Sequence, residues 1–158
     1  TEMQNRTDNF GSSVDDQYLV FTLNDKKYGV DLIKVQEIKE WEEPTEVLGA
    51  PKEMRGLLNL RGVVVPVVDM RIRFDMGEAN FTRETVIIVT YISGKKVGLV
   101  VDSVSDVVTL SEGQFKKSPK VDGFAADHIK GVATLEDGMV ILLNTERMLS
   151  KAVLEVGC

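Results

Sequence analysis

The chain has 158 residues, of which 43% are apolar and 28% are charged, and its formal net charge is -6. This length suits one domain, or two small lobes that need each other because each alone would bury too little apolar surface. The negative charge disfavours a general nucleic-acid surface, which would repel phosphates. The longest apolar run, Val63 to Val68, includes a proline and is far too short to span a bilayer.

The first 16 residues are polar and contain no apolar segment, so we expect a flexible N-terminal lead-in over residues 1–16. At the other end, residues 151–158 are expected to form a tail. Cys158 is the only cysteine, which excludes an intramolecular disulfide and is typical of a protein from a reducing compartment.

A β-hairpin is predicted near the start of the folded part. Tyr18 to Leu23 is rich in aromatic and β-branched residues, Asn24-Asp25 supplies a turn, and Lys27 to Val30 resumes the apolar pattern. After the hairpin, a helical turn and a bulged strand would each place Val35 and Ile38 on one face, and the pattern leaves both possibilities open.

The next segments predict a buried strand followed by a helical turn. Glu40 to Pro44 is charged and ends in proline, so we expect an exposed turn that carries Trp41, the only tryptophan. Met54 to Leu60 leads into Val63 to Asp69, whose uniformly apolar pattern predicts burial on both faces. Because Pro66 lacks a backbone donor, this strand is expected at a sheet edge or bulged at the proline. Met70 to Phe74 is expected to form a helical turn.

The second half of the chain predicts the same succession of elements. Thr85 to Tyr91 and Lys96 to Val101 form a hairpin around Ser93-Gly94. A long loop is expected over 111–127, followed by strands at 129–135 and 139–144 and by a short helix from Thr145 to Leu149.

These two halves are internal repeats. Residues 19–38 align with 88–107 at an offset of 69, and residues 55–69 align with 130–144 at an offset of 75. We therefore expect one folded domain over 17–150, built from repeats at about 18–74 and 85–149. Many short strands with close turns predict a pair of small barrels that share a core.

The sequence offers little for catalysis. His128 is the only histidine and has no serine or cysteine arrangement that would make it the base of a triad, so we expect a surface or capping residue. The glycines are scattered, without a phosphate-binding loop, and no metal or other cofactor is implied. An enzyme or ligand-binding barrel that uses Asp102, Asp106 and His128 remains the rival hypothesis.

The repeats differ at one informative position. Where the first repeat has Asn59-Leu60-Arg61-Gly62, the second has Thr134-Leu135-Glu136-Asp137, so only the first carries an arginine in this turn. Arginine suits carboxylates and is enriched at interface hot spots, although a solvated hairpin arginine explains the residue equally well.

Several strings of residues resemble one family closely. They are Tyr18-Leu19-Val20-Phe21, Tyr28-Gly29-Val30, Val35-Gln36-Glu37-Ile38, Gly56 to Gly62 followed by Pro66-Val67-Val68-Asp69, and Val97 to Asp102 with Val104 and Val107. From about Gln17 to Leu149, the chain resembles the CheW family of bacterial chemotaxis coupling proteins.

The resemblance implies a mainly β fold of two SH3-like five-stranded β-barrel subdomains packed together, with short helices. It implies a non-catalytic, cytoplasmic scaffold that couples the cytoplasmic tips of methyl-accepting chemoreceptors to the regulatory domain of the histidine kinase CheA. Such a protein is recruited to membrane-associated receptor arrays, has no cofactor, and can alternate with the kinase or with other copies in rings. We prefer a stand-alone protein, and a CheW-like domain excised from a larger adaptor such as CheV, or from CheA, is the alternative.

The resemblance also assigns roles to individual residues. The receptor-binding residues carried over from the family are Glu37, Ile38, Arg61, Val86 and Val107. The kinase-binding residues are Val35, Gly56 and Gly131. A second contact within rings is expected at Lys116, Lys117, Lys120 and Val121.

Overall fold

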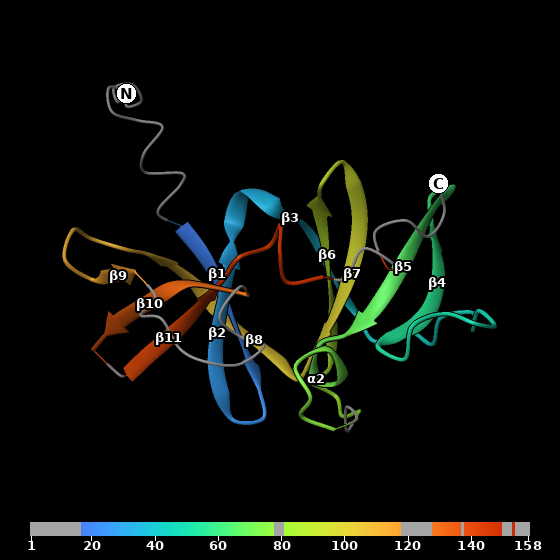
Figure 1. Cartoon of the computed structure of the whole chain (residues 1–158), viewed down its shortest axis with the longest axis horizontal. Coiled ribbons are helices and arrows are strands. Elements are labelled where there is room, and N and C mark those ends of the chain that lie inside the picture. Colours follow the sequence, from blue (N-terminus) through green and yellow to red (C-terminus); the bar gives the residue numbers. More distant parts are fainter. Residues whose placement is uncertain (1–16, 78–80, 118–127, 137, 150–152, 154–158) are drawn as a thin grey trace.

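Two β-sheets lie side by side in the computed structural model, which describes residues 17–77, 81–117, 128–136, 138–149 and 153 (Figure 1). Three of the expected segments lie wholly or partly outside the described residues. They are the lead-in at 1–16, the long loop from 118 to 127, and the tail apart from Val153. The mainly β fold with two subdomains is therefore confirmed.

The six-stranded sheet lies on the left of Figure 1 and the five-stranded sheet on the right. In spatial order the first consists of β8 (Ser103–Thr109), β1 (Gln17–Leu23), β2 (Lys26–Asp31), β11 (Gly138–Leu143), β10 (Ile129–Leu135) and β9 (Phe115–Lys117). The second consists of β3 (Val35–Glu40), β6 (Val86–Ile92), β7 (Lys95–Val101), β5 (Val63–Asp69) and β4 (Met54–Leu60). Both predicted hairpins, β1 with β2 and β6 with β7, are confirmed.

The two sheets repeat one strand order, and each takes strands from both halves of the chain. Under the sequence alignment, β8, β1, β2, β11 and β10 correspond in turn to β3, β6, β7, β5 and β4. In each sheet one parallel pair, β2 with β11 or β7 with β5, joins strands from different halves. The chain crosses to the five-stranded sheet through the 3-10 helix η1 (Leu32–Lys34) and returns at Asp102, between β7 and β8.

The main core lies between the two sheets. It contains side chains of the six-stranded sheet such as Phe21 and Leu143 together with Val68, Ile88 and Leu99 of the five-stranded sheet, and all five are almost fully buried. Burying one such side chain contributes about 1.5–3 kcal/mol. Each sheet also has a smaller apolar cluster of its own. The cluster of the five-stranded sheet includes Leu58 and Val100, and that of the six-stranded sheet includes Val20 and Leu142. The subdomains thus depend on a shared core for their stability.

Helix α2 (Met70–Arg73) follows β5 because Asp69 caps it. The Asp69 carboxylate accepts hydrogen bonds from the backbone N–H groups of Arg71 at 3.0 Å and Ile72 at 3.4 Å. The helical turn expected here is confirmed. The helix expected after β11 is wrong: residues 145–147 form only a turn, and the Asn144 side chain accepts from the Glu146 backbone at 3.1 Å.

The prediction for β5 was wrong in two respects. Val63 and Val64 are exposed, and burial begins only at Val65. The strand lies between β4 and β7 and not at an edge, and its register with β4 is regular at Pro66. Pairing with β7 begins at Val67, so Pro66 precedes that ladder.

None of the helical segments in the described ranges combines the length and apolar character needed to cross a membrane.

Candidate functional site

Arg61 lies in the tight turn between β4 and β5. Its φ is 53° and that of Gly62 is 87°, and the turn is held by a hydrogen bond of 2.8 Å from the Gly62 N–H to the Asn59 side chain. The Arg61 guanidinium forms an ion pair with Glu37 of β3. Since β3 and β4 are the two edge strands of the five-stranded sheet, this pair links one edge strand to the turn that follows the other.

The pair also presents a charged surface, because the side chains of Arg61 and Glu37 are 75% and 30% exposed. Ile38 follows Glu37 and is 46% exposed, and its repeat equivalent on β8, Val107, is 47% exposed. Val86 stands opposite Glu40 in the β3–β6 ladder, is partly buried, and packs against the shared core. The structure thus joins Arg61 and Glu37 directly and places exposed apolar residues on both subdomains.

Gly56 and Gly131, which are equivalent in the repeat, are both buried and admit a close neighbour. A Cβ on Gly56 would lie 2.2 Å from the Thr45 carbonyl oxygen, and one on Gly131 would lie 2.6 Å from the Phe115 ring and from the Lys116 carbonyl oxygen. Gly56 also has a φ of 149°. Both glycines therefore shape the backbone and expose no side chain to a partner.

The remaining predicted contacts are more varied. Val35 is partly buried against the shared core. Lys116 and Lys117 lie on β9, which pairs with β10, and the Lys116 side chain is exposed. Lys120 and Val121 lie outside the described residues.

The three residues of the rival hypothesis have separate surroundings. Asp102 is paired with Arg71, Asp106 is exposed on β8, and His128 lines a recess to which neither acid contributes. His128 was expected to be a surface or capping residue, and a surface position is wrong because the residue is buried. Its Nε2 lies 3.0 Å from Nη2 of Arg73; because arginine can only donate, this ring nitrogen accepts. The geometry does not assemble a catalytic group from these three.

The Arg71–Asp102 ion pair lies at the junction of the sheets, where the chain passes from β7 to β8. Nε of Arg71 donates to Oδ1 at 2.8 Å and Nη2 donates to Oδ2 at 2.6 Å. Burial acts to raise the pKa of Asp102, but hydrogen bonds from Arg71 and from the Asn24 backbone, with the charge of Arg71, outweigh it and lower that pKa. The hydrogen bonding between Arg71 and Asp102 also raises the pKa of Arg71.

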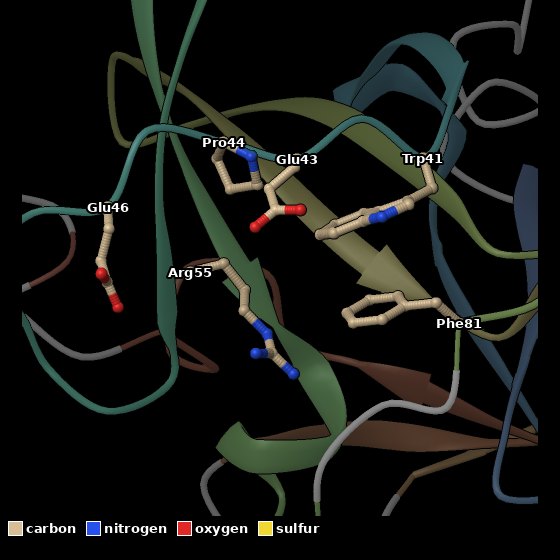
Figure 2. Close-up of a pocket in the computed structure, with 6 residues that line it drawn as sticks. All are labelled: Trp41, Glu43, Pro44, Glu46, Arg55 and Phe81. Carbon is tan, nitrogen blue, oxygen red and sulfur yellow. The ribbon is translucent and has the colours of Figure 1, made fainter.

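A recess beside Trp41 was not predicted from the sequence. It has a volume of about 210 Å³ and is lined by Trp41, Glu43, Pro44, Glu46, Arg55 and Phe81. Figure 2 shows the two aromatic rings one above the other, with a centroid distance of 4.1 Å and an interplanar angle of 15°. Arg55 lies 5.1 Å from the centre of the Phe81 ring. The stacking joins residues 40 positions apart, which no local pattern signals.

The recess is open, with two carboxylates and two aromatic rings in its wall, so it suits an exposed side chain of a partner better than a reaction. Within the described ranges, no three His, Cys, Asp or Glu side chains gather in a way that could hold a metal ion.

Comparisons with known proteins agree on one family. A sequence profile described as a CheW-like domain matches residues 17–153. The chemotaxis protein CheW of Klebsiella aerogenes is 37% identical over 141 residues, which cover 89% of this chain and 85% of that protein. The CheW of Bacillus subtilis strain 168 is 32% identical over 139 residues, covering 86% and 88%. The crystal structure of the scaffolding protein TtCheW from Thermoanaerobacter tengcongensis matches with a TM-score of 0.81 at 29% identity, covering 88% of this chain and 95% of that one.

Proposed function

The chain belongs to the CheW family, and on this basis we propose that it is a chemotaxis scaffold that couples chemoreceptor cytoplasmic tips to the histidine kinase CheA. In this role it is non-catalytic, works in the cytoplasm, and is recruited to membrane-associated receptor arrays. The relatives from Klebsiella aerogenes and Bacillus subtilis carry the name CheW, and the structural neighbour is described as a scaffolding protein.

The observation that supports this function most directly is the exposed Arg61–Glu37 pair beside Ile38. An arginine and a carboxylate next to an exposed isoleucine can offer polar specificity and apolar contact to one partner helix. We assign the receptor surface to these three residues together with Val107 and Val86.

The kinase surface is proposed around Val35, Gly56 and Gly131. Because the two glycines are buried, they contribute by shaping the strands around them, and the contacts come from neighbouring side chains. The basic strand β9, with Lys116 and Lys117, is proposed for the second contact within rings, as are Lys120 and Val121. That contact would be made with the kinase or with other copies of this chain.

Reconstitution tests the proposal. CheA and a clustered receptor cytoplasmic fragment are mixed with increasing amounts of this protein, and phosphorylation of the kinase is followed. We expect dose-dependent activation that Arg61→Glu abolishes and that Arg83→Glu, the same charge change at another exposed arginine, leaves intact. A protein that binds CheA but never changes its activity would contradict the coupling role.

A further inference from the structure

Each of the two places where the chain crosses between the sheets carries a cluster of polar contacts. At η1, Nζ of Lys34 lies 2.9 Å from Oε2 of Glu146, and Oγ of Ser93 donates to Oε1 of Glu146 at 2.7 Å. We call these three residues the outer clasp. At the other crossing, Arg71 binds Asp102, whose Oδ2 also accepts from the Asn24 backbone at 2.8 Å. These three residues form the inner clasp.

The clasps are related by the internal repeat. Ser93 aligns with Asn24 at the offset of 69, and Glu146 aligns with Arg71 at the offset of 75. Lys34 lies one position beyond the residue that aligns with Asp102. Each clasp brings together a residue that follows a strand of one sheet, a crossing, and a hairpin turn of the other sheet. In the outer clasp Glu146 makes both contacts, whereas in the inner clasp Asp102 of the crossing binds both Arg71 and the Asn24 N–H. The signs of the charges are reversed.

The two clasps differ in strength. Arg71 and Asp102 meet through two parallel hydrogen bonds, and their side chains are only 20% and 22% exposed. Lys34 reaches one oxygen of Glu146, and these side chains are 33% and 46% exposed. A bidentate, partly buried pair holds its geometry better than a single exposed pair, which water and salt screen.

We propose that the clasps set the angle between the two sheets, with the inner clasp as a hinge and the outer clasp as a releasable contact. Lys34 and Glu146 are then positioning residues: when their contact opens, the sheets rotate about Arg71 and Asp102. The shared core limits this rotation to a small angle.

Two strands connect the hinge to the proposed partner surfaces. β3 begins directly after Lys34 and carries Ile38, and β8 begins directly after Asp102 and carries Val107. Release of the outer clasp therefore moves one exposed apolar residue relative to the other. This consequence for receptor binding rests on the proposed function, whereas the hinge itself does not.

Distance measurements by pulsed electron paramagnetic resonance test the hinge without any partner. Spin labels are placed on Glu40→Cys and Thr134→Cys, exposed positions on β3 of one sheet and β10 of the other, in a Cys158→Ser background. We expect a narrow distance distribution at low salt that widens at least twofold in Glu146→Gln. The distance distribution of the protein with an intact clasp should widen similarly in 1 M salt, where the Debye length is about 3 Å. Lys34→Glu combined with Glu146→Lys should restore the narrow distribution.

Two further variants complete the test. Asp102→Asn, which weakens the hinge, should shift the mean distance as well as widen the distribution. Breaking the exposed Lys39–Glu42 pair with Glu42→Gln should change nothing, because this pair does not join the sheets.

The hinge would be overturned if Glu146→Gln kept the original width, or if Asp102→Asn and Glu146→Gln had the same effect. If Asp102→Asn fails to fold, Glu146→Gln and the reversed Lys34–Glu146 pair still test the hinge. Lys34 and Glu146 lie at the surface, so these changes should not prevent folding. Receptor binding is then measured separately: a change in distance without a change in affinity would contradict the proposed surface and leave the hinge intact.

Discussion

Arg55 donates two hydrogen bonds to one oxygen of the fully buried Asp69 carboxylate, from Nε at 3.1 Å and from Nη2 at 2.8 Å. The other oxygen of Asp69 caps α2 through the N–H groups of Arg71 and Ile72. One carboxylate therefore joins β4, β5 and α2.

Replacing Asp69 with alanine is expected to lower the free energy of unfolding by about 4 kcal/mol. The cap contributes about 1 kcal/mol, and removing one partner of a buried ion pair costs about 3–5 kcal/mol, toward the low end here because Arg55 can reach water. Urea denaturation measures the change. Glu46→Ala, at an exposed acid of the same region, is the control and should stay within about 0.5 kcal/mol. A loss of stability no larger than the control's would contradict the structural role of Asp69.

The two buried glycines predict a graded loss of stability. In Gly131→Ala the new methyl group meets the Phe115 ring and the Lys116 carbonyl oxygen at 2.6 Å, and β9 lies at the sheet edge, where it can shift. In Gly56→Ala the methyl group meets Thr45 backbone at 2.2 Å and the φ of 149° adds strain. We expect a cost of about 1–3 kcal/mol for Gly131→Ala and a larger one for Gly56→Ala.

Thermal unfolding of both variants checks this order. Adding Phe115→Ala to Gly131→Ala should recover part of the loss, because the ring clash disappears while the clash with the carbonyl oxygen remains. Equal stability of all variants would show that the strands move apart freely. If either glycine variant loses kinase binding while keeping its full stability, the glycine acts at the contact itself.

The Arg61–Glu37 pair should affect partner binding far more than stability. Its exposure limits its contribution to about 0–1 kcal/mol. We expect Arg61→Glu to be nearly as stable as the original, and Arg61→Glu with Glu37→Arg to recover whatever small loss occurs. A double-mutant cycle by urea denaturation gives the coupling energy, and a coupling above about 2 kcal/mol would mean that the stability of the fold depends on this pair.

The sequence predicted strand positions well because turns and apolar alternation are local signals. The two hairpins at 18–30 and 85–101 illustrate this, as does the helical turn after Asp69. The pairing of β2 with β11 could not be predicted: β5 and β11 carry equivalent patterns, so the sequence does not say which of them a hairpin selects. Residues of both strands, such as Tyr28 and Leu143, meet in the shared core, a contact across more than 100 residues that no local pattern encodes.

Errors arose where a side chain's surroundings come from distant elements. The residues around His128 do not predict its contact with Arg73, which lies 55 positions away in the sequence. The burial of His128 was therefore not predicted. The apolar run at Val63 and Val64 signalled burial that no element described here supplies. For the candidate site, the repeat difference drew attention to Arg61, but only the fold shows that it meets Glu37.

Acid should weaken the inner clasp in a predictable direction. The pKa of Asp102 is lowered in the folded protein, because the hydrogen bonds from Arg71 and Asn24 and the charge of Arg71 outweigh the burial that acts to raise it. The unfolded carboxyl titrates near 4. The stabilising contribution is therefore complete above about pH 5 and is lost as the pH falls through the lower, folded pKa.

Asp102→Asn removes this titration. Urea midpoints between pH 3 and 7 should show a constant deficit of the variant above about pH 5, and a deficit that shrinks as the pH falls below about 4. Glu146 shows the same direction, since hydrogen bonds from Ser93 and Lys34 lower its pKa. Parallel curves over the whole range would mean that the pKa of Asp102 is the same in the folded and the unfolded protein.

Trp41 is the only tryptophan and stacks on Phe81, so its fluorescence reports on the recess between them. In Phe81→Ala one face of the indole becomes accessible to water, and the emission maximum should move to longer wavelength. Tyr91→Ala, at an exposed aromatic residue on β6, is the matched control and should leave the maximum unchanged. Addition of a partner that fills the recess should shift the emission of the original protein and have less effect on Phe81→Ala. If Phe81→Ala emits at the original wavelength, the indole is shielded by the apolar cluster of the five-stranded sheet, which includes Leu58 and Val100, and not by the stacked ring.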